Sequence, residues 1–272
     1  MPDRSSHHAL TLHLAARTSA GRIRSYNEDA FSIESSGSNV AYGPPDSHLT
    51  LTSTAALFGV YDGLGRSPAG YTTSSLAAHA IHATLQPDWP LMTCESLARR
   101  LVLAVQAANQ RIFTNGRTDP SARGLSTRAT VAAAVDRHLK LAHVGDTRAY
   151  LLRDRQLRQI SRDHTLANEP LEPGRLTPEE AAMFDHNKLI TRTLGMAESV
   201  KVDVYSLDLA PGDVVLLCTD GVHGVLDNLQ IQSILADATD PTECSVALIE
   251  AADEAGGYDS ETAIVAMVQP LV

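Results

Sequence analysis

The sequence is poor in aromatic residues, in cysteine and in positive charge, and each shortage excludes a class of protein. Phe, Trp and Tyr make up only 4% of the 272 residues, so Ala, Val and Leu must fill the interior. The three cysteines, Cys94, Cys218 and Cys244, are an odd number at unrelated spacings, which argues against a disulfide framework and favours reduced thiols in a cytoplasmic protein. The net charge of -10 argues against nucleic acid or an anionic membrane as the main partner.

Long apolar runs are absent as well. No stretch reaches the roughly 18 apolar residues that a membrane-spanning helix needs, and the first residues lack the apolar core of a signal peptide. With 43% hydrophobic residues the chain can nevertheless bury a full core, and we expect a single domain over residues 1–272. We therefore expect a cytoplasmic protein with no membrane partner, and its polar composition favours a monomer.

Four aspartates stand at the borders of apolar, strand-like runs. Asp62 ends the run 56–61 and is followed at once by glycine, which breaks the strand. Asp146 in LAHVGDTR and Asp220 in DVVLLCTDGV also follow apolar runs, whereas Asp259 in GGYDSETAIVAMV precedes one. If the first three strands end where the last begins, antiparallel pairing brings these four carboxylates together.

Such a cluster is unfavourable unless a cation compensates it. Carboxylates a few Å apart repel one another and raise one another's pKa, and a bare buried carboxylate is costlier still. Divalent cations are the simplest remedy. The ligands are hard oxygens with no His or Cys interleaved, which favours Mg²⁺ or Mn²⁺ over Zn²⁺.

The order of the predicted elements indicates an α+β protein. Strands are expected near 10–17 and 30–35, two helices over 69–85 and 93–115, a strand meander over 129–161, and a second helical pair within 228–255. Strands, then helices, then strands again are typical of antiparallel sheets rather than of a βαβ repeat.

Three segments are predicted to be irregular. Residues 35–54 are rich in Ser, Thr, Gly and Pro and are expected to form a surface loop. Residues 165–195 are expected to form a flap over the site, with one short helix that begins with the capping box of Thr177 and Glu180. Residues 1–9 are expected to be a flexible end.

Six segments, in order and at consistent spacing, match a known family. They are RSYNEDA at 24–30, VYDGLG at 60–65, AHVGDTRAYLLRDRQLRQISRDHT at 142–165, LITRTLG at 189–195, LLCTDGV at 216–222 and GGYDSETAIV at 256–265. By these segments the chain resembles the bacterial form of the metal-dependent protein serine/threonine phosphatases of the PP2C (PPM) type. The resemblance implies an αββα sandwich of two antiparallel sheets flanked by helical pairs, with a metal centre at one end.

The resemblance also implies roles for residues of this chain. Asp62 would bridge two Mn²⁺ or Mg²⁺ ions, the Gly63 carbonyl with Glu28 and Asp29 would serve one ion directly or through water, and the other ion would be held by Asp220 and Asp259. Asp146 matches the residue that helps bacterial relatives to hold a third, weaker metal. Arg24 matches the arginine that grips the substrate phosphate, a task that suits a planar guanidinium.

Several positions depart from the family pattern. Leu64 stands where animal relatives have a candidate general acid, and His164 is considered as its substitute. Ser126, followed by Thr127 and Arg128, replaces the usual glycine before a threonine-rich strand, a change that is expected to alter a loop near the site. Every matched metal-binding carboxylate is nevertheless present.

The function implied is hydrolysis of phosphoserine and phosphothreonine in proteins by a hydroxide that bridges the metals, opposing a bacterial Ser/Thr kinase. Two ions about 3.5–4 Å apart lower the pKa of such a water, and no covalent phosphoenzyme is needed. Two alternatives remain: a pseudophosphatase that binds phosphoproteins without turnover, and a phosphatase for regulators of the anti-sigma-antagonist type. Lost metal carboxylates would mark the pseudophosphatase.

Overall fold

The computed structural model describes residues 10–35, 41–43, 48–65, 68–85, 89–168 and 189–270. Within these ranges the chain forms strands, helices and two short 3-10 turns (Trp89–Leu91 and Pro120–Ala122). The strands are β1 (Leu10–Ser19), β2 (Asp29–Ser35), β3 (Ala41–Gly43), β4 (His48–Ser53), β5 (Ala55–Leu64), β6 (Ser126–Val135), β7 (His138–Val144), β8 (Arg148–Arg153), β9 (Gln156–Gln159), β10 (Asp203–Asp208), β11 (Val214–Cys218) and β12 (Glu261–Pro270). The helices are α1 (Pro68–Leu85), α2 (Cys94–Thr118), α4 (Asp220–His223), α5 (Asn228–Asp237) and α6 (Pro241–Glu254).

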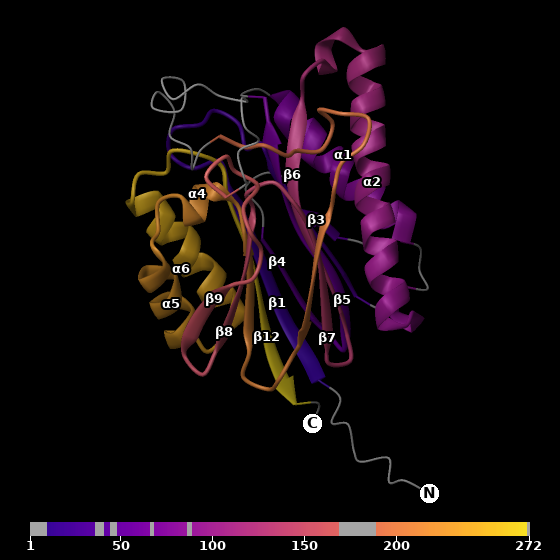
Figure 1. The fold of residues 1–272 in the computed structure, drawn as a ribbon. Helices are drawn as coiled ribbons and strands as arrows, with labels where there is room; N and C mark the ends of the chain where they lie inside the picture. Colours follow the sequence, from indigo (N-terminus) through magenta and orange to yellow (C-terminus); the bar gives the residue numbers. More distant parts are fainter. Residues whose placement is uncertain are drawn as a thin grey trace, which may run out of the picture.

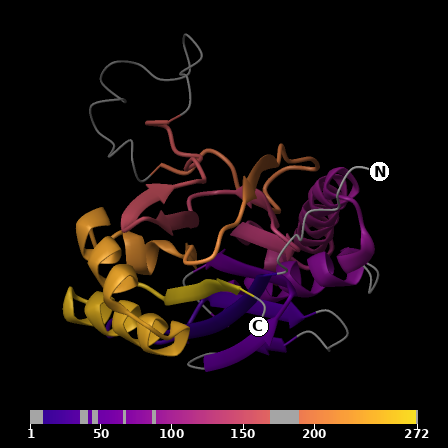
Figure 2. The ribbon, with the colours of Figure 1, turned by 90° about the horizontal axis from the view of Figure 1, so that it is seen from below.

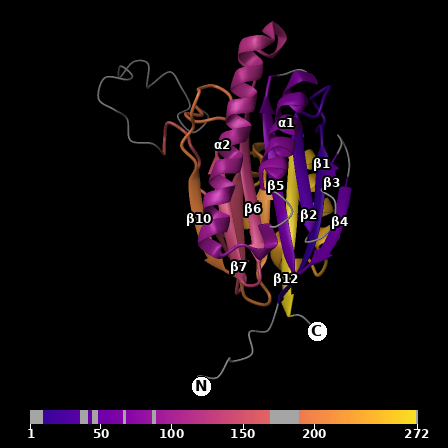
Figure 3. The ribbon, with the colours of Figure 1, turned by 90° about the vertical axis from the view of Figure 1, so that its right-hand side faces the viewer.

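Two antiparallel sheets lie face to face, each with helices on its outer side (Figure 1). One sheet has the strand order β4-β1-β12-β11-β8-β9, and the other has the order β10-β7-β6-β5-β2-β3. Helices α1 and α2 cover the second sheet, as Figure 3 shows, whereas α5 and α6 cover the first, so that the helical pairs lie on opposite outer faces (Figure 2). The predicted α+β sandwich and the assignment of the helical pairs are confirmed.

Three apolar layers hold this arrangement together, and single strands contribute to two of them. In β5, Leu57 and Tyr61 pack with the helices, while Phe58 and Val60 pack between the sheets. This period of two follows from the pleat of a strand, which points successive side chains to opposite faces. Because both faces are covered, the strand is apolar almost throughout instead of alternating with polar residues.

Helices α2 and α6 begin at polar residues that the sequence offers as caps. Thr93 accepts a hydrogen bond from the backbone N–H of Ser96 at the start of α2, and Asp240 does the same for Thr242 and Glu243 at the start of α6. These side chains satisfy amide groups that the first turn of a helix leaves without a partner. None of the helices in the described part of the chain combines the length and the apolar character that crossing a membrane requires.

The expectation of a loop over residues 35–54 was wrong in part. The described residues of this segment form β3 and β4, and β4 pairs antiparallel with β1, so that Leu51 lies opposite Leu14. The composition suggested a loop, but Leu and Thr alternate there, as on an edge strand with one face on the core. In the predicted flap the described ends are joined, since Thr165 pairs with Ile190; residues 169–188, with the predicted capping box, and residues 1–9 lie outside the described residues.

Replacing a core side chain between the sheets should destabilise the fold strongly. Phe58 is fully buried, so Phe58→Ala should lower the free energy of unfolding by about 3–5 kcal/mol, because a cavity remains where the ring was. Urea unfolding followed by circular dichroism measures this change. Leu229→Ala, at a position 75% exposed on α5, is the matched control and should change the stability by no more than about 0.5 kcal/mol.

Candidate metal centre

Antiparallel register places three of the charged residues side by side. Asp62 on β5 lies directly opposite Asp29 on β2 and directly opposite Arg128 on β6. Asp62 also shares its face of β5 with Phe58 and Val60, which pack between the sheets. The three side chains therefore point into the space between the sheets, at the end of the sandwich where β5 finishes.

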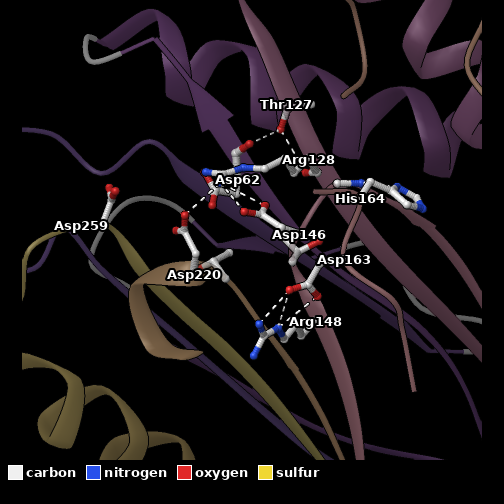
Figure 4. Close-up of polar contacts among 12 residues, drawn as sticks. Asp62, Thr127, Arg128, Asp146, Arg148, Asp163, His164, Asp220 and Asp259 are labelled. Carbon is white, nitrogen blue, oxygen red and sulfur yellow. Dashed lines mark hydrogen bonds and ion pairs between the residues drawn. The ribbon is translucent and has the colours of Figure 1, made fainter. Parts of the chain in front are cut away.

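The other sheet delivers two further carboxylates to the same end. Asp220 follows β11 and begins the short helix α4, and Asp259 precedes β12, the neighbour of β11. Both residues line a cleft of about 700 Å³ together with Arg24, Glu28 and Arg128. The strand ends that were predicted to meet do meet, and Figure 4 shows Asp62, Asp146 and Asp220 facing one another, with Asp259 to one side.

Arg128 lies in the middle of this cluster. Its Nη2 pairs with Asp62, and its Nη1 lies 2.9 Å from Asp220 Oδ2 and 3.0 Å and 3.2 Å from the two oxygens of Asp146. The side chain is 5% exposed. Sequence reasoning placed Arg128 only near the site and missed that its guanidinium binds three of the predicted ligands. The available signal was an arginine in an otherwise apolar strand, since a buried charge requires partners.

Burial and the Arg128 charge set the pKa values of these carboxyl groups. Burial raises the pKa of Asp62 well above its ordinary value, and Arg128 offsets only part of that rise. Burial likewise raises the pKa of Asp146 to about 6. Burial also raises the pKa of Asp220, but Arg128, His223 and the side chain of Asp62 together outweigh it, so this pKa lies below the ordinary value. A dense group of carboxyl groups around one guanidinium is thus short of positive charge.

Glu28 and Asp29 are held by polar groups of the neighbouring strands and helix. Thr219 and Thr262 each donate a hydroxyl hydrogen bond of 2.7 Å to Asp29 Oδ2. Glu28 donates its backbone N–H to Ser260 Oγ at 2.9 Å, and its side chain lies against Gly70 of α1. A Cβ atom at position 70 would come within 2.6 Å of Glu28 Oε1, so glycine is required for this close approach.

Arg24, predicted to grip phosphate, contacts two of the predicted ligands. Its Nη2 donates to Asp259 Oδ2 at 2.6 Å, and its Nη1 lies 3.7 Å from Glu28 Oε2. The guanidinium lines the cleft, where its planar fork can reach an anion. Gly63 lies beside it in the cleft wall, and its N–H donates to the Glu28 carbonyl at 3.2 Å.

His164, considered as a general acid, lies away from the carboxylates. Its Nδ1 accepts a hydrogen bond from the Gly145 N–H at 3.0 Å, and its Nε2 is 3.4 Å from Asp203. Figure 4 shows its ring pointing away from Asp62. The cleft is instead lined by His223, whose Nε2 donates to the Asp146 carbonyl at 2.9 Å and which sequence reasoning did not single out. Burial lowers the pKa of His223 to about 4, so the ring is neutral near pH 7.

The cleft also contains a second, partly buried ion pair that the sequence did not reveal. Arg148 holds both oxygens of Asp163, with three contacts between 2.7 and 3.0 Å, and also donates to the Tyr150 hydroxyl. Because this pair neutralises itself, it adds no net charge to the cleft.

The model of the family described as protein phosphatase 2C matches residues 22–260 of this sequence. The chain belongs to the protein phosphatase 2C family. Among its curated relatives, the serine/threonine phosphatase stp of Listeria monocytogenes is 27% identical over 253 residues, 93% of this chain and 94% of that protein. The serine/threonine protein phosphatase PstP of Mycobacterium tuberculosis is 32% identical over 265 residues, 95% of this chain but only 45% of that protein.

Solved structures agree with this family membership. The catalytic domain of PstP, in complex with two manganese ions, superposes with a TM-score of 0.74 at 32% identity, covering 96% of this chain and 99% of that one. The S. agalactiae serine/threonine phosphatase superposes with a TM-score of 0.79 at 24% identity, covering 94% of this chain and 99% of that one, which supports the fold.

The oxygen ligands of this protein phosphatase 2C domain suit divalent cations, although the described side chains are not arranged as a complete metal site. Among the described residues, no three acidic, His or Cys side chains converge on one point, as expected where a guanidinium separates them. Yet Asp29, Asp62 and Asp220 each have one buried carboxylate oxygen with no hydrogen-bond partner. Unpartnered buried carboxylate oxygens are costly, and Mg²⁺ or Mn²⁺ would satisfy them. The residues therefore fit metal ions.

Acid should destabilise this domain partly through His143, a buried neighbour of His164. Burial lowers the pKa of His143 to about 3, so between that pH and about 6.5 only the unfolded chain binds this proton. Stability from this residue is complete above about pH 6.5 and falls by about 1.4 kcal/mol per unit as the pH decreases. His143→Gln removes this dependence.

Urea unfolding of the wild type and His143→Gln at pH 7 and pH 5 measures the effect. The stability difference between the two proteins should shift by about 2 kcal/mol in favour of the variant at the lower pH. His79→Gln, on the exposed side of α1, is the matched control. Equal differences at both pH values would contradict the assignment to His143.

Proposed function

We propose that this chain is a metal-dependent phosphatase that hydrolyses phosphoserine and phosphothreonine in proteins. The observation that supports this most is that Asp62, Asp220 and Asp259 all lie at one end of the sandwich, where Asp220, Asp259 and Arg24 line the same cleft. Carboxylates that need divalent cations, beside a guanidinium that suits an anion, form the combination that phosphoryl transfer requires. The family named above and its curated relatives support the same reaction.

We assign one Mn²⁺ or Mg²⁺ to Asp62, Gly63, Glu28 and Asp29, and the other to Asp62, Asp220 and Asp259. When bound, two such ions supply an activated water and offset charge on the transferring phosphoryl group. Among the described residues, these five carboxylates and Asp146 are paired with the positive charges of Arg24 and Arg128 only, so the residues themselves cannot neutralise the cleft.

The protein residues have separate tasks in this proposal. Arg24 orients the phosphate, and its bond to Asp259 keeps that carboxylate at the cleft edge until substrate arrives. The two threonine hydroxyls on Asp29 hold its other oxygen toward the site. Leu64, Ile190 and Val225 line the cleft beside the charged groups and would exclude water around the phosphorylated side chain.

We further propose a cytoplasmic monomer that opposes a Ser/Thr kinase. Reduced thiols and the net charge of -10 support the cytoplasm and argue against nucleic acid. The pseudophosphatase alternative has little support, because every matched carboxylate is present and the relatives reported above are named phosphatases. A preference for regulators of the anti-sigma-antagonist type would change the partner and not the chemistry.

Phosphate release from a phosphothreonine peptide tests the function directly. Turnover is expected with Mn²⁺ or Mg²⁺ and should be lost in EDTA. Asp220→Asn should lower kcat/KM by more than about 100-fold, because even outer-shell partners of a metal cost about 10–100-fold. Arg153→Met, which breaks an ion pair with Asp213 away from the cleft, controls for loss of an ion pair as such. No turnover by a folded protein with either metal would favour the pseudophosphatase.

Replacing Arg24 should weaken catalysis through the phosphate. Arg24→Ala should lower kcat/KM by about 10–100-fold, since a charged hydrogen bond contributes about 1.5–3 kcal/mol. Arg24→Lys should restore only part of this, because lysine keeps the charge but not the paired geometry. Steady-state kinetics on the same peptide measure both variants. A kcat/KM equal to that of the wild type in Arg24→Ala would contradict the role of Arg24 in binding the phosphate.

A further inference from the structure

The three carboxylates around Arg128 are not used equally. Both oxygens of Asp146 lie within hydrogen-bond distance of Arg128 Nη1, at 3.0 and 3.2 Å. Asp62 and Asp220 each give only one oxygen to the guanidinium, and the second oxygen of each is buried without a partner. Arg128 therefore contacts both oxygens of Asp146, whereas one oxygen of Asp62 and one of Asp220 are left for another cation.

Nη1 of Arg128 also lies between two carboxylates. It bonds to Asp220 Oδ2 at 2.9 Å while it binds Asp146, so a single nitrogen links the two groups. An ion held jointly by Asp146 and Asp220 would have to lie in this same place. A divalent ion and a guanidinium at contact distance repel strongly in a buried site, so the two exclude one another.

Strand pairing and a neighbouring loop hold the Arg128 side chain in this position. Arg128 belongs to β6, and its register opposite Asp62 is set by the pairing of β5 with β6. Gly145, the residue before Asp146, has φ of +114°, and a Cβ atom there would come within 2.5 Å of Arg128 Cβ. The loop that carries Asp146 is thus packed against the stem of Arg128, and glycine permits that contact.

A role in gripping phosphate is less consistent with these contacts. Both terminal nitrogens of Arg128 already face carboxylates, and Nε is buried without a hydrogen-bond partner. Arg24, by contrast, is about a quarter exposed and lines the cleft. Arg24, and not Arg128, would therefore bind the substrate phosphate.

We propose that Arg128 is a built-in cation that removes Asp146 from the metal ligands, so that the centre binds two divalent ions and excludes a third. The inference rests on the proposed metal-dependent function and specifies its metal content. It departs from the expectation that Asp146 helps to hold an ion. A cation fixed to the chain differs from a bound metal in that it cannot be removed by a chelator.

Counting bound Mn²⁺ tests the proposal. Equilibrium dialysis of each protein against millimolar MnCl₂, with the metal determined by mass spectrometry, gives the number of ions per chain. The wild type should bind two. Arg128→Met, which keeps the length of the side chain but not its charge, should bind a third ion. The double variant Arg128→Met, Asp146→Asn should return to two, and Asp146→Asn alone should remain at two.

Two further variants serve as controls for the number of bound Mn²⁺ ions. Arg128→Lys retains the charge and should bind two ions, and Arg153→Met, an arginine paired with Asp213 outside the cleft, should also bind two. Arg128→Met leaves its carboxylates without a counter-ion, so its folding is checked by circular dichroism in saturating Mn²⁺. Its melting temperature should rise more on Mn²⁺ addition than that of the wild type, because the ion replaces the lost charge.

The outcomes separate this proposal from the function on which it rests. Two ions in both the wild type and Arg128→Met, or loss of an ion in Asp146→Asn alone, would overturn the role of Arg128 and leave the phosphatase intact. Three ions in the wild type would also overturn it. No bound ion in a folded wild type would overturn the metal-dependent function, and the present inference with it.

Discussion

Repulsion among carboxylates gathered at one end of the sandwich is the constraint on which the rest of this structure depends. The chain brings acidic side chains from both sheets to one cleft and buries several of them, and in a poorly solvated site each one raises the pKa of the next. The fold answers with specific partners: threonine hydroxyls for Asp29, Arg24 for Asp259, and Arg128 for three others. These partners leave part of the negative charge uncompensated, and divalent cations would balance it. This excess of negative charge is the physical basis of the proposed chemistry.

The apolar layers make this concentration of charge possible. Two sheets packed face to face, with helices outside both, bury the strands on each side, so a site at the strand ends stands on a rigid support. The carboxylates pack at the edge of the layer between the sheets, where Phe58 and Val60 give way to Asp62 along one strand. Apolar burial thus offsets the electrostatic cost of the site, and the fold tolerates a cluster that would be unstable alone.

Most of the fold and of the candidate site could be predicted because strong local signals coincide with the segments that resemble the PP2C family. Asp62, Asp220 and Asp259 each border an apolar run, and caps such as Thr93 and Asp240 mark the helix starts. The prediction over residues 35–54 failed where composition and alternation disagree, since β4 owes its existence to pairing with β1. A segment with weak local preference takes its structure from the strand beside it.

The sequence by itself determined the fold class, the order of the helices and which acidic residues stand at the borders of apolar runs, because each depends on periodicity and on residues close in the chain. Only the tertiary structure decided which charges touch. Arg128 lies 66 residues from Asp62 in the chain, and the antiparallel register of β5 and β6 sets them opposite one another. It likewise decided that His164 faces Asp203 and not the cleft. Contacts of this kind depend on strand register and burial, which no local pattern specifies.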